Sequence, residues 1–142
     1  MESNELKFVL AKDRCTLISA ALGWLGSINT TLIGIHVTTL YLHLAVLNRS
    51  FLAKAYMTGG IATASTLALV FGSYLVWKDR AGMGGGFLNL AGGVVTLTLC
   101  CYFTSIFPLL RQLEPIAYLL PTPALASGLL ASFMLKSDSK NI

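Results

Sequence analysis

Four long stretches without a charged side chain constrain this chain more than any other feature. They cover residues 15–48, 55–77, 81–110 and 115–135. A helix needs about 20 mostly apolar residues to cross the hydrocarbon core of a bilayer, so each stretch is long enough for one crossing. Only 11% of the residues are charged, against about a quarter in an ordinary globular chain. The sequence therefore predicts an all-α integral membrane protein.

The first stretch is the longest, and its length allows two arrangements. One tilted helix over residues 17–47 would cross once and project beyond the bilayer. Two crossings would need a tight turn near Asn29 or Gly34, where no charged residue holds the turn at the membrane surface. We favour the single tilted helix. Further spans at about 55–77, 87–110 and 115–135 complete a bundle of four transmembrane helices with up-and-down topology over residues 15–136, between a polar segment (1–14) and a polar tail (137–142).

Two prolines interrupt the fourth span. Proline has no amide hydrogen and clashes with the preceding turn of a helix, so Pro121 and Pro123 predict a kinked fourth helix. Thr122 and Pro123 also form a suitable N-cap and first helical residue, and a new helix that starts at Thr122 is the alternative. The glycine-rich residues 82–86, ahead of the third span, are expected to be a flexible connection.

The distribution of Lys and Arg predicts the orientation, because cytoplasmic loops of membrane proteins carry an excess of both. Four crossings place Lys7, Lys12, Arg14, Lys78, Arg80, Lys136 and Lys140 on one side, and Arg49, Lys54 and Arg111 on the other. Both termini are therefore expected on the cytoplasmic side. The net charge of +4 is spread over these flanks, so membrane lipid is an expected partner and nucleic acid is not.

Small residues recur along three of the spans. Helices in lipid gain little hydrophobic energy from contact, so close packing depends on small side chains that let the backbones approach. The expected packing residues are Gly23, Ser27 and Gly34 in the first span, Gly60, Ala64, Ala68 and Gly72 in the second, and Gly93 in the third. These stripes favour a structural, accessory or interaction subunit that contacts other membrane subunits or a second copy of itself.

A polar face lies opposite the small residues of the first span. Asn29, His36 and His43 repeat every seventh position and lie within about 40° of one line on a helix. Polar groups in a membrane normally face the bundle interior or a partner. The structural interpretation is that these side chains hydrogen-bond to neighbouring helices.

The alternative interpretation is a small membrane enzyme or binding protein for a lipophilic substrate. Its candidate residues are His36, His43, Arg111 and Glu114: Arg111 would bind a phosphate or carboxylate, and Glu114 or His43 would move a proton. The two histidines lie about 10.5 Å apart along a helix axis, too far to share one ion, and no carboxylate falls within a span. No metal or cofactor is therefore predicted, and whether the protein is an enzyme stays open.

Overall fold

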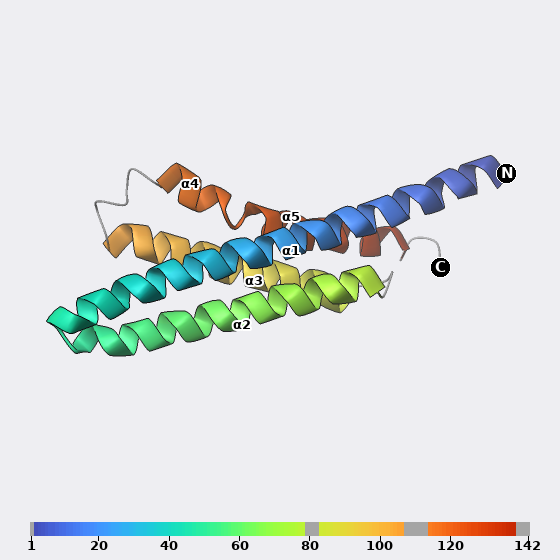
Figure 1. Ribbon diagram of the computed structural model, residues 1–142. Helices are drawn as coiled ribbons and strands as arrows, with labels where there is room; N and C mark the ends of the chain where they lie inside the picture. The colour runs from blue at the N-terminus through green and yellow to red at the C-terminus, as the bar shows by residue number, and fades with distance from the viewer. Residues whose placement is uncertain (1, 79–82, 107–113, 139–142) are drawn as a thin grey trace.

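The computed structural model is all-helical (Figure 1) and describes residues 2–78, 83–106 and 114–138, with the side chains of residues 13–78, 84–106 and 116–133. Its helices are α1 (Glu2–Leu47), α2 (Ser50–Lys78), α3 (Met83–Ile106), α4 (Glu114–Leu119) and α5 (Thr122–Asp138). Four segments are long and apolar enough to cross a membrane: Asp13–Leu47, Ser50–Lys78, Gly84–Ile106 and Ile116–Phe133. The predictions of an all-helical chain and of four such segments are confirmed.

The first helix is continuous. α1 has 46 residues, with no turn near Asn29 or Gly34, and it starts within the polar segment that precedes the first apolar stretch. In Figure 1 its N-terminal end extends well beyond the neighbouring helices. A two-residue connection leads to α2, and there the Ser50 amide donates to Asn48 Oδ1 over 3.0 Å.

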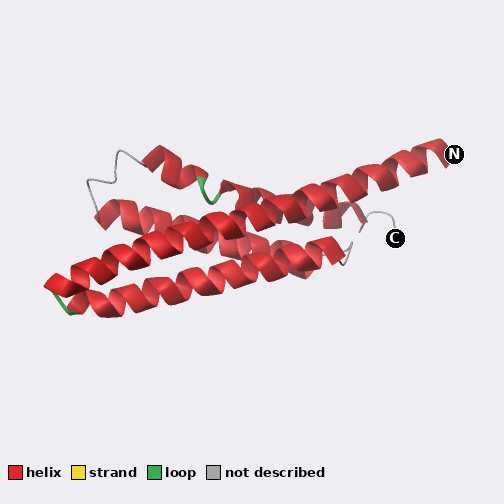
Figure 2. Ribbon diagram, in the orientation of Figure 1, coloured by secondary structure: helices red, strands yellow, loops and turns green. Residues whose placement is uncertain are grey.

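The long helices form a ring. α1 packs against α2 and α5, and α3 packs against the same two helices, so α1 and α3 lie diagonally across the bundle. Figure 2 shows the two short breaks in helical structure among the described residues, one between α1 and α2 and one between α4 and α5. The fourth span is thus built from α4 and α5, and α4 makes few contacts with the rest of the bundle.

Small side chains fill most of the buried positions, with Tyr41 and Leu69 as large exceptions, and many large apolar side chains are exposed. Leu32, Ile35 and Phe87 are 60%, 60% and 74% exposed, whereas the fully or nearly fully buried positions include Ala20, Ala124 and several Ser and Thr residues. A soluble protein buries its large apolar side chains, but helices in lipid pack through small residues. The distribution is typical of helices that lie in a membrane.

The glycine-rich residues before the third span are not the flexible connection that we expected from the sequence. α3 begins at Met83, and Gly85 and Gly86 belong to its first turns. A Cβ on Gly85 would lie 2.8 Å from the backbone nitrogen of Val76, and one on Gly86 would lie 2.7 Å from the Ala131 Cβ. These glycines let α3 approach α2 and α5 closely, which outweighs the low helix propensity of glycine.

Candidate functional site

A cluster of buried polar side chains joins all four long helices. It consists of Ser19 from α1, Ser73 from α2, Asn89 from α3 and Ser127 from α5, each 0% exposed. Asn89 Nδ2 donates to Ser127 Oγ over 2.7 Å, and Ser127 Oγ donates to the Ser19 carbonyl over 2.6 Å. Ser19 Oγ donates in return to the Ser127 carbonyl over 2.8 Å. We call this group the polar cluster.

Gly23 lies at the centre of the polar cluster. A Cβ there would lie 2.7 Å from Asn89 Nδ2 and 3.0 Å from Ser127 Oγ, and closer still to Ser73 Oγ. Because any side chain would occupy the space of these polar atoms, only glycine fits. The sequence marked Gly23 as a packing residue but did not predict the hydrogen bonds. The available signal was Asn89, an amide in the middle of an apolar span.

A second buried layer connects α1 directly to α3. The hydroxyls of Thr30 and Thr96 lie 2.9 Å apart, and both side chains are buried. One helical turn away, a Cβ on Gly26 would lie 2.7 Å from the Ala124 Cβ of α5. Close backbone approach therefore brings short side chains from diagonal helices within hydrogen-bonding distance.

Four other predicted packing residues also lie between helices. A Cβ on Gly34 would lie 2.5 Å from the Ala62 Cβ, one on Gly72 would lie 2.8 Å from the Gly85 carbonyl oxygen, and one on Gly93 would lie 3.0 Å from the Leu125 amide nitrogen. The Ser27 side chain is buried and donates to the Trp24 carbonyl of its own helix over 2.7 Å.

The rest of the predicted stripe on α2 turns away from the bundle. Gly60 and Ala64 are exposed, Ala68 is half-buried, and no heavy atom lies within 4 Å of a Cβ placed on Gly60. The reason is geometric, because each step of four residues rotates by about 40° around a helix. The buried residues of α2 follow a different path: Ala55, Thr58, Ala62, Ser65, Leu69, Gly72, Ser73 and Val76.

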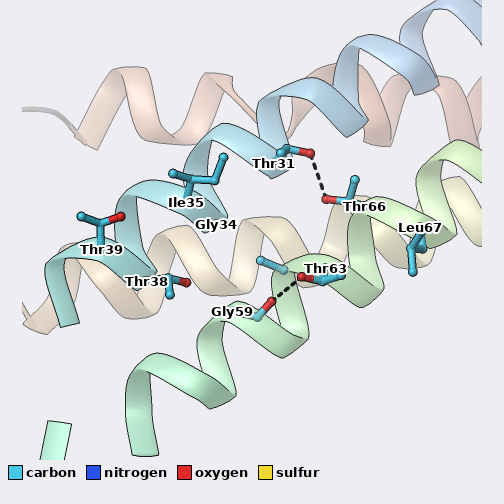
Figure 3. A pocket seen from close by; sticks show the side chains of 10 residues that line it. Thr31, Gly34, Ile35, Thr38, Thr39, Gly59, Thr63, Thr66 and Leu67 are labelled. Carbon is cyan, nitrogen blue, oxygen red and sulfur yellow. Dashed lines mark hydrogen bonds between the residues drawn. The ribbon is translucent and has the colours of Figure 1, made fainter. Parts of the chain in front are cut away.

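A groove of about 420 Å³ lies on the outer side of the contact between α1 and α2 (Figure 3). We call it the outer groove; its lining residues are Thr31, Gly34, Ile35, Thr38, Thr39, Gly59, Ala62, Thr63, Thr66 and Leu67. The Thr31 and Thr66 hydroxyls lie 3.3 Å apart across it, and Thr63 donates to the Gly59 carbonyl over 2.8 Å. The described residues offer no hydrogen-bond partner to the buried Thr38 Oγ1.

Asn29, on the polar face of α1, binds the break in the fourth span. In a continuous helix the Leu119 carbonyl would accept from the amide of residue 123, which is a proline and has no hydrogen to give. Thr122 Oγ1 instead donates to the Leu119 carbonyl over 2.5 Å. The Asn29 side-chain amide donates to the adjacent Leu120 carbonyl over 3.0 Å. Asn29 therefore holds the junction of α4 and α5 against α1.

The two histidines have different surroundings. His43 is exposed, and its Nδ1 donates to the Thr39 carbonyl of the same helix over 2.8 Å. His36 is exposed as well, and it lines a hollow of about 400 Å³ between α1, α3 and α4. We call it the inner hollow; its lining residues are Leu32, Ile33, His36, Val37, Cys100, Phe103, Thr104, Ile116, Ala117 and Leu120.

The other two candidate residues do not join the histidines in the described site. Arg111 lies outside the described residues, and Glu114 is the first residue of α4, with a side chain that is not described. Within the described part of the chain, no three His, Cys, Asp or Glu side chains are grouped so that they could hold a metal ion. Comparisons with known protein families, curated proteins and solved structures found no match to this chain.

Proposed function

We propose that this chain is an integral membrane protein that crosses the bilayer four times, with both termini on the cytoplasmic side. The exposed large apolar side chains of all four spans support insertion in lipid. Aromatic and basic residues mark the two ends of α2: Trp77 packs near Tyr74, the Lys78 Nζ lies 5.5 Å from the centre of the Tyr74 ring, and the Lys54 Nζ lies 5.2 Å from that of Phe51. Such residues anchor helix ends at membrane surfaces.

Within that membrane, we propose a structural or accessory role in which the outer groove receives a transmembrane helix of another subunit. One observation carries this proposal: a groove rich in Thr and Gly lies on a surface where the rest of the bundle presents large apolar side chains. Close contact between helices in lipid is built with such residues. A groove that the bundle itself leaves uncovered is therefore suited to one more helix.

Gly60 extends this surface along α2. Gly60, Thr63 and Leu67 are spaced by three and four residues, so they share one face of α2. No atom of the bundle approaches a Cβ on Gly60, and a partner backbone can therefore come close there. The exposed hydroxyls of Thr31 and Thr63 supply acceptors, and side-chain hydrogen bonds between membrane helices contribute about 0.6 kcal/mol on average.

Thr63→Leu and Gly60→Leu test this role, because Thr63 lines the outer groove and Gly60 lies next to it on the same face of α2. Both should leave the bundle intact, because they enlarge side chains on an open surface, but they should exclude the partner helix by filling its site. Native mass spectrometry after extraction in mild detergent measures the mass of the assembly. Ala91→Leu is the matched control, because it adds the same side chain at an exposed position of α3 outside the groove.

The expected result is loss of the added mass in the two α2 variants and its retention in Ala91→Leu. An added mass equal to one chain would identify a second copy as the occupant. The proposal is wrong if the wild-type chain is extracted alone, or if the α2 variants keep the same companions as the wild type.

A second candidate function, binding of a lipophilic molecule, is favoured by the position of His36 in the inner hollow. Its catalytic form depends on Arg111 and Glu114, whose side chains lie outside the described part of the molecule. Its binding form requires only His36 and the apolar walls.

A further inference from the structure

Among the three residues of the polar face of α1, His36 has no hydrogen-bond partner in the described part of the chain. Asn29 donates to the Leu120 carbonyl and His43 to the Thr39 carbonyl, whereas no described group lies within hydrogen-bonding distance of the His36 ring. A neutral imidazole has one donor and one acceptor nitrogen. A polar group placed in an apolar medium without a hydrogen bond is strongly disfavoured. The His36 ring is exposed on the bundle, so a molecule from outside the bundle can reach it and supply the hydrogen bond.

The inner hollow provides the space for that partner. Its volume of about 400 Å³ falls within the range of about 300–1,000 Å³ that small-molecule sites occupy. The space arises because the fourth span is broken after Leu119, so the short helix α4 forms one wall and makes few contacts with α3. Large side chains, Phe103 and Leu32 among them, line the hollow.

The walls of the inner hollow are almost entirely apolar. The Thr104 hydroxyl donates to the Cys100 carbonyl of its own helix over 3.0 Å, which leaves His36 as the strongest hydrogen-bonding group at the hollow. No residue among those that line it carries a fixed charge. An ionised ligand would be disfavoured in such a site, because a buried charge needs a paired group.

We propose that the inner hollow binds one neutral lipophilic molecule whose single polar group, a carbonyl or hydroxyl oxygen, hydrogen-bonds to the His36 imidazole. This proposal deepens the second candidate function and rests on the same hollow, and it does not depend on the outer groove. The two sites share no lining residue. Ile116, at the edge of the hollow, is largely exposed, so a molecule dissolved in the bilayer reaches the site from the lipid.

Two probes of equal chain length test the proposal. 2-Dodecanone carries a carbonyl and dodecane does not, so both can fill the hollow but only the ketone can accept from His36. The full chain in detergent micelles is loaded with both, and the amounts that co-elute with it are measured by gas chromatography against empty micelles. One neutral hydrogen bond predicts a preference for the ketone of roughly three- to tenfold over that in empty micelles.

Three variants locate the effect. His36→Leu should lower the preference to that of empty micelles, whereas His43→Leu, on the same helix but outside the hollow, should leave it unchanged. Ala117→Leu adds bulk to the α4 wall and should reduce retention of both probes, and circular dichroism checks that each variant keeps its helices.

Either of two results would overturn the proposal. A wild-type preference equal to that of empty micelles would show that His36 does not bind the ketone, and a preference that survives in His36→Leu would place the ketone elsewhere. If Gly60→Leu loses its partner helix but keeps the ketone preference, the packing role and the ligand site are separate. If both probes bind equally in all variants, the second candidate function loses its hydrogen-bonding site while the packing role stands.

Discussion

The two halves of the bundle are packed differently. In the half that holds the polar cluster, glycines and alanines bring the helices close, and the side chains of Ser19, Ser73, Asn89 and Ser127 fill the interior. In the half that holds the inner hollow, Gly34 still lies against Ala62, but rings also fill the interior: the Tyr41 ring lies 6.2 Å from that of Phe51 and 6.5 Å from that of Phe103, measured between ring centres.

The difference shows how residue size controls both polarity and space in this fold. Short polar side chains can bond across a bundle only where the backbones are close, and closeness requires small residues. Where large side chains lie between the helices, the buried hydroxyls of Thr58 and Thr104 donate to carbonyls of their own helices, and a hollow is left beside α4. We infer that the first half holds the bundle together and that the second half is the part able to take up a ligand.

The strongest test of the comparison is Gly23→Leu. The added side chain would displace Asn89 and Ser127 from the polar cluster. Overpacking alone costs about 1–3 kcal/mol, and an unsatisfied buried polar group costs about as much again, so we expect this variant to lose the native bundle. The chain has two tryptophans, and their rings lie 6.2 Å apart in this half, so tryptophan emission reports the change directly.

Gly60→Leu is the matched control for that experiment. It makes the same substitution at a glycine with open space around it, and the bundle should form normally, with unchanged tryptophan emission and elution volume. Equal loss of folded protein in both variants would contradict the central position of Gly23.

A smaller effect is expected from Asn89→Ala. This change removes the donor to Ser127 Oγ and should lower the free energy of unfolding by about 1–3 kcal/mol. Titration with sodium dodecyl sulfate, followed by circular dichroism, measures the shift. Thr98→Ala, at an exposed position of α3 whose hydroxyl donates only to the Val94 carbonyl of the same helix, should change the unfolding free energy by less than about 0.5 kcal/mol. If the two variants unfold alike, the polar cluster does not stabilise this half.

The parts of the fold that follow from composition were predictable from the sequence. The charge-free stretches located the four apolar segments, and the lack of a charged residue near Asn29 favoured the single long helix that α1 forms. These features depend on two properties that each segment has by itself: its length and its hydrophobicity.

The features that depend on neighbouring helices were not predictable in the same way. The stripe from Gly60 to Gly72 reads as one face in the sequence, but it winds around α2 because four residues exceed one helical turn. The glycines at the start of α3 indicated a loop, because their contacts with Val76 and Ala131 involve other helices. The pairing of Asn29 with the Leu120 carbonyl likewise requires α4 and α5 to be in place.

Asn29→Leu should have the smallest effect, and it tests whether the halves respond separately. It removes the hydrogen bond that holds the α4–α5 junction to α1, which is worth about 0.6–1.7 kcal/mol in a membrane protein. Opening of the inner hollow should then expose Cys100, which is buried and lines it, and its reaction with N-ethylmaleimide should accelerate by about 3- to 18-fold. Cys15→Ala and Cys101→Ala remove the exposed thiols from the background.

The emission of Trp24 and Trp77 should stay unchanged in Asn29→Leu, because both rings lie in the half with the polar cluster. Thr98→Val is the control, since its exposed hydroxyl donates only to Val94 of the same helix and neither readout should move. A faster thiol reaction with constant emission would show that the hollow opens while the polar cluster stays closed. If the thiol reaction and the tryptophan emission instead shift by the same free energy, the bundle opens as one cooperative unit. The division into a half that stabilises the bundle and a half that binds a ligand would then be wrong.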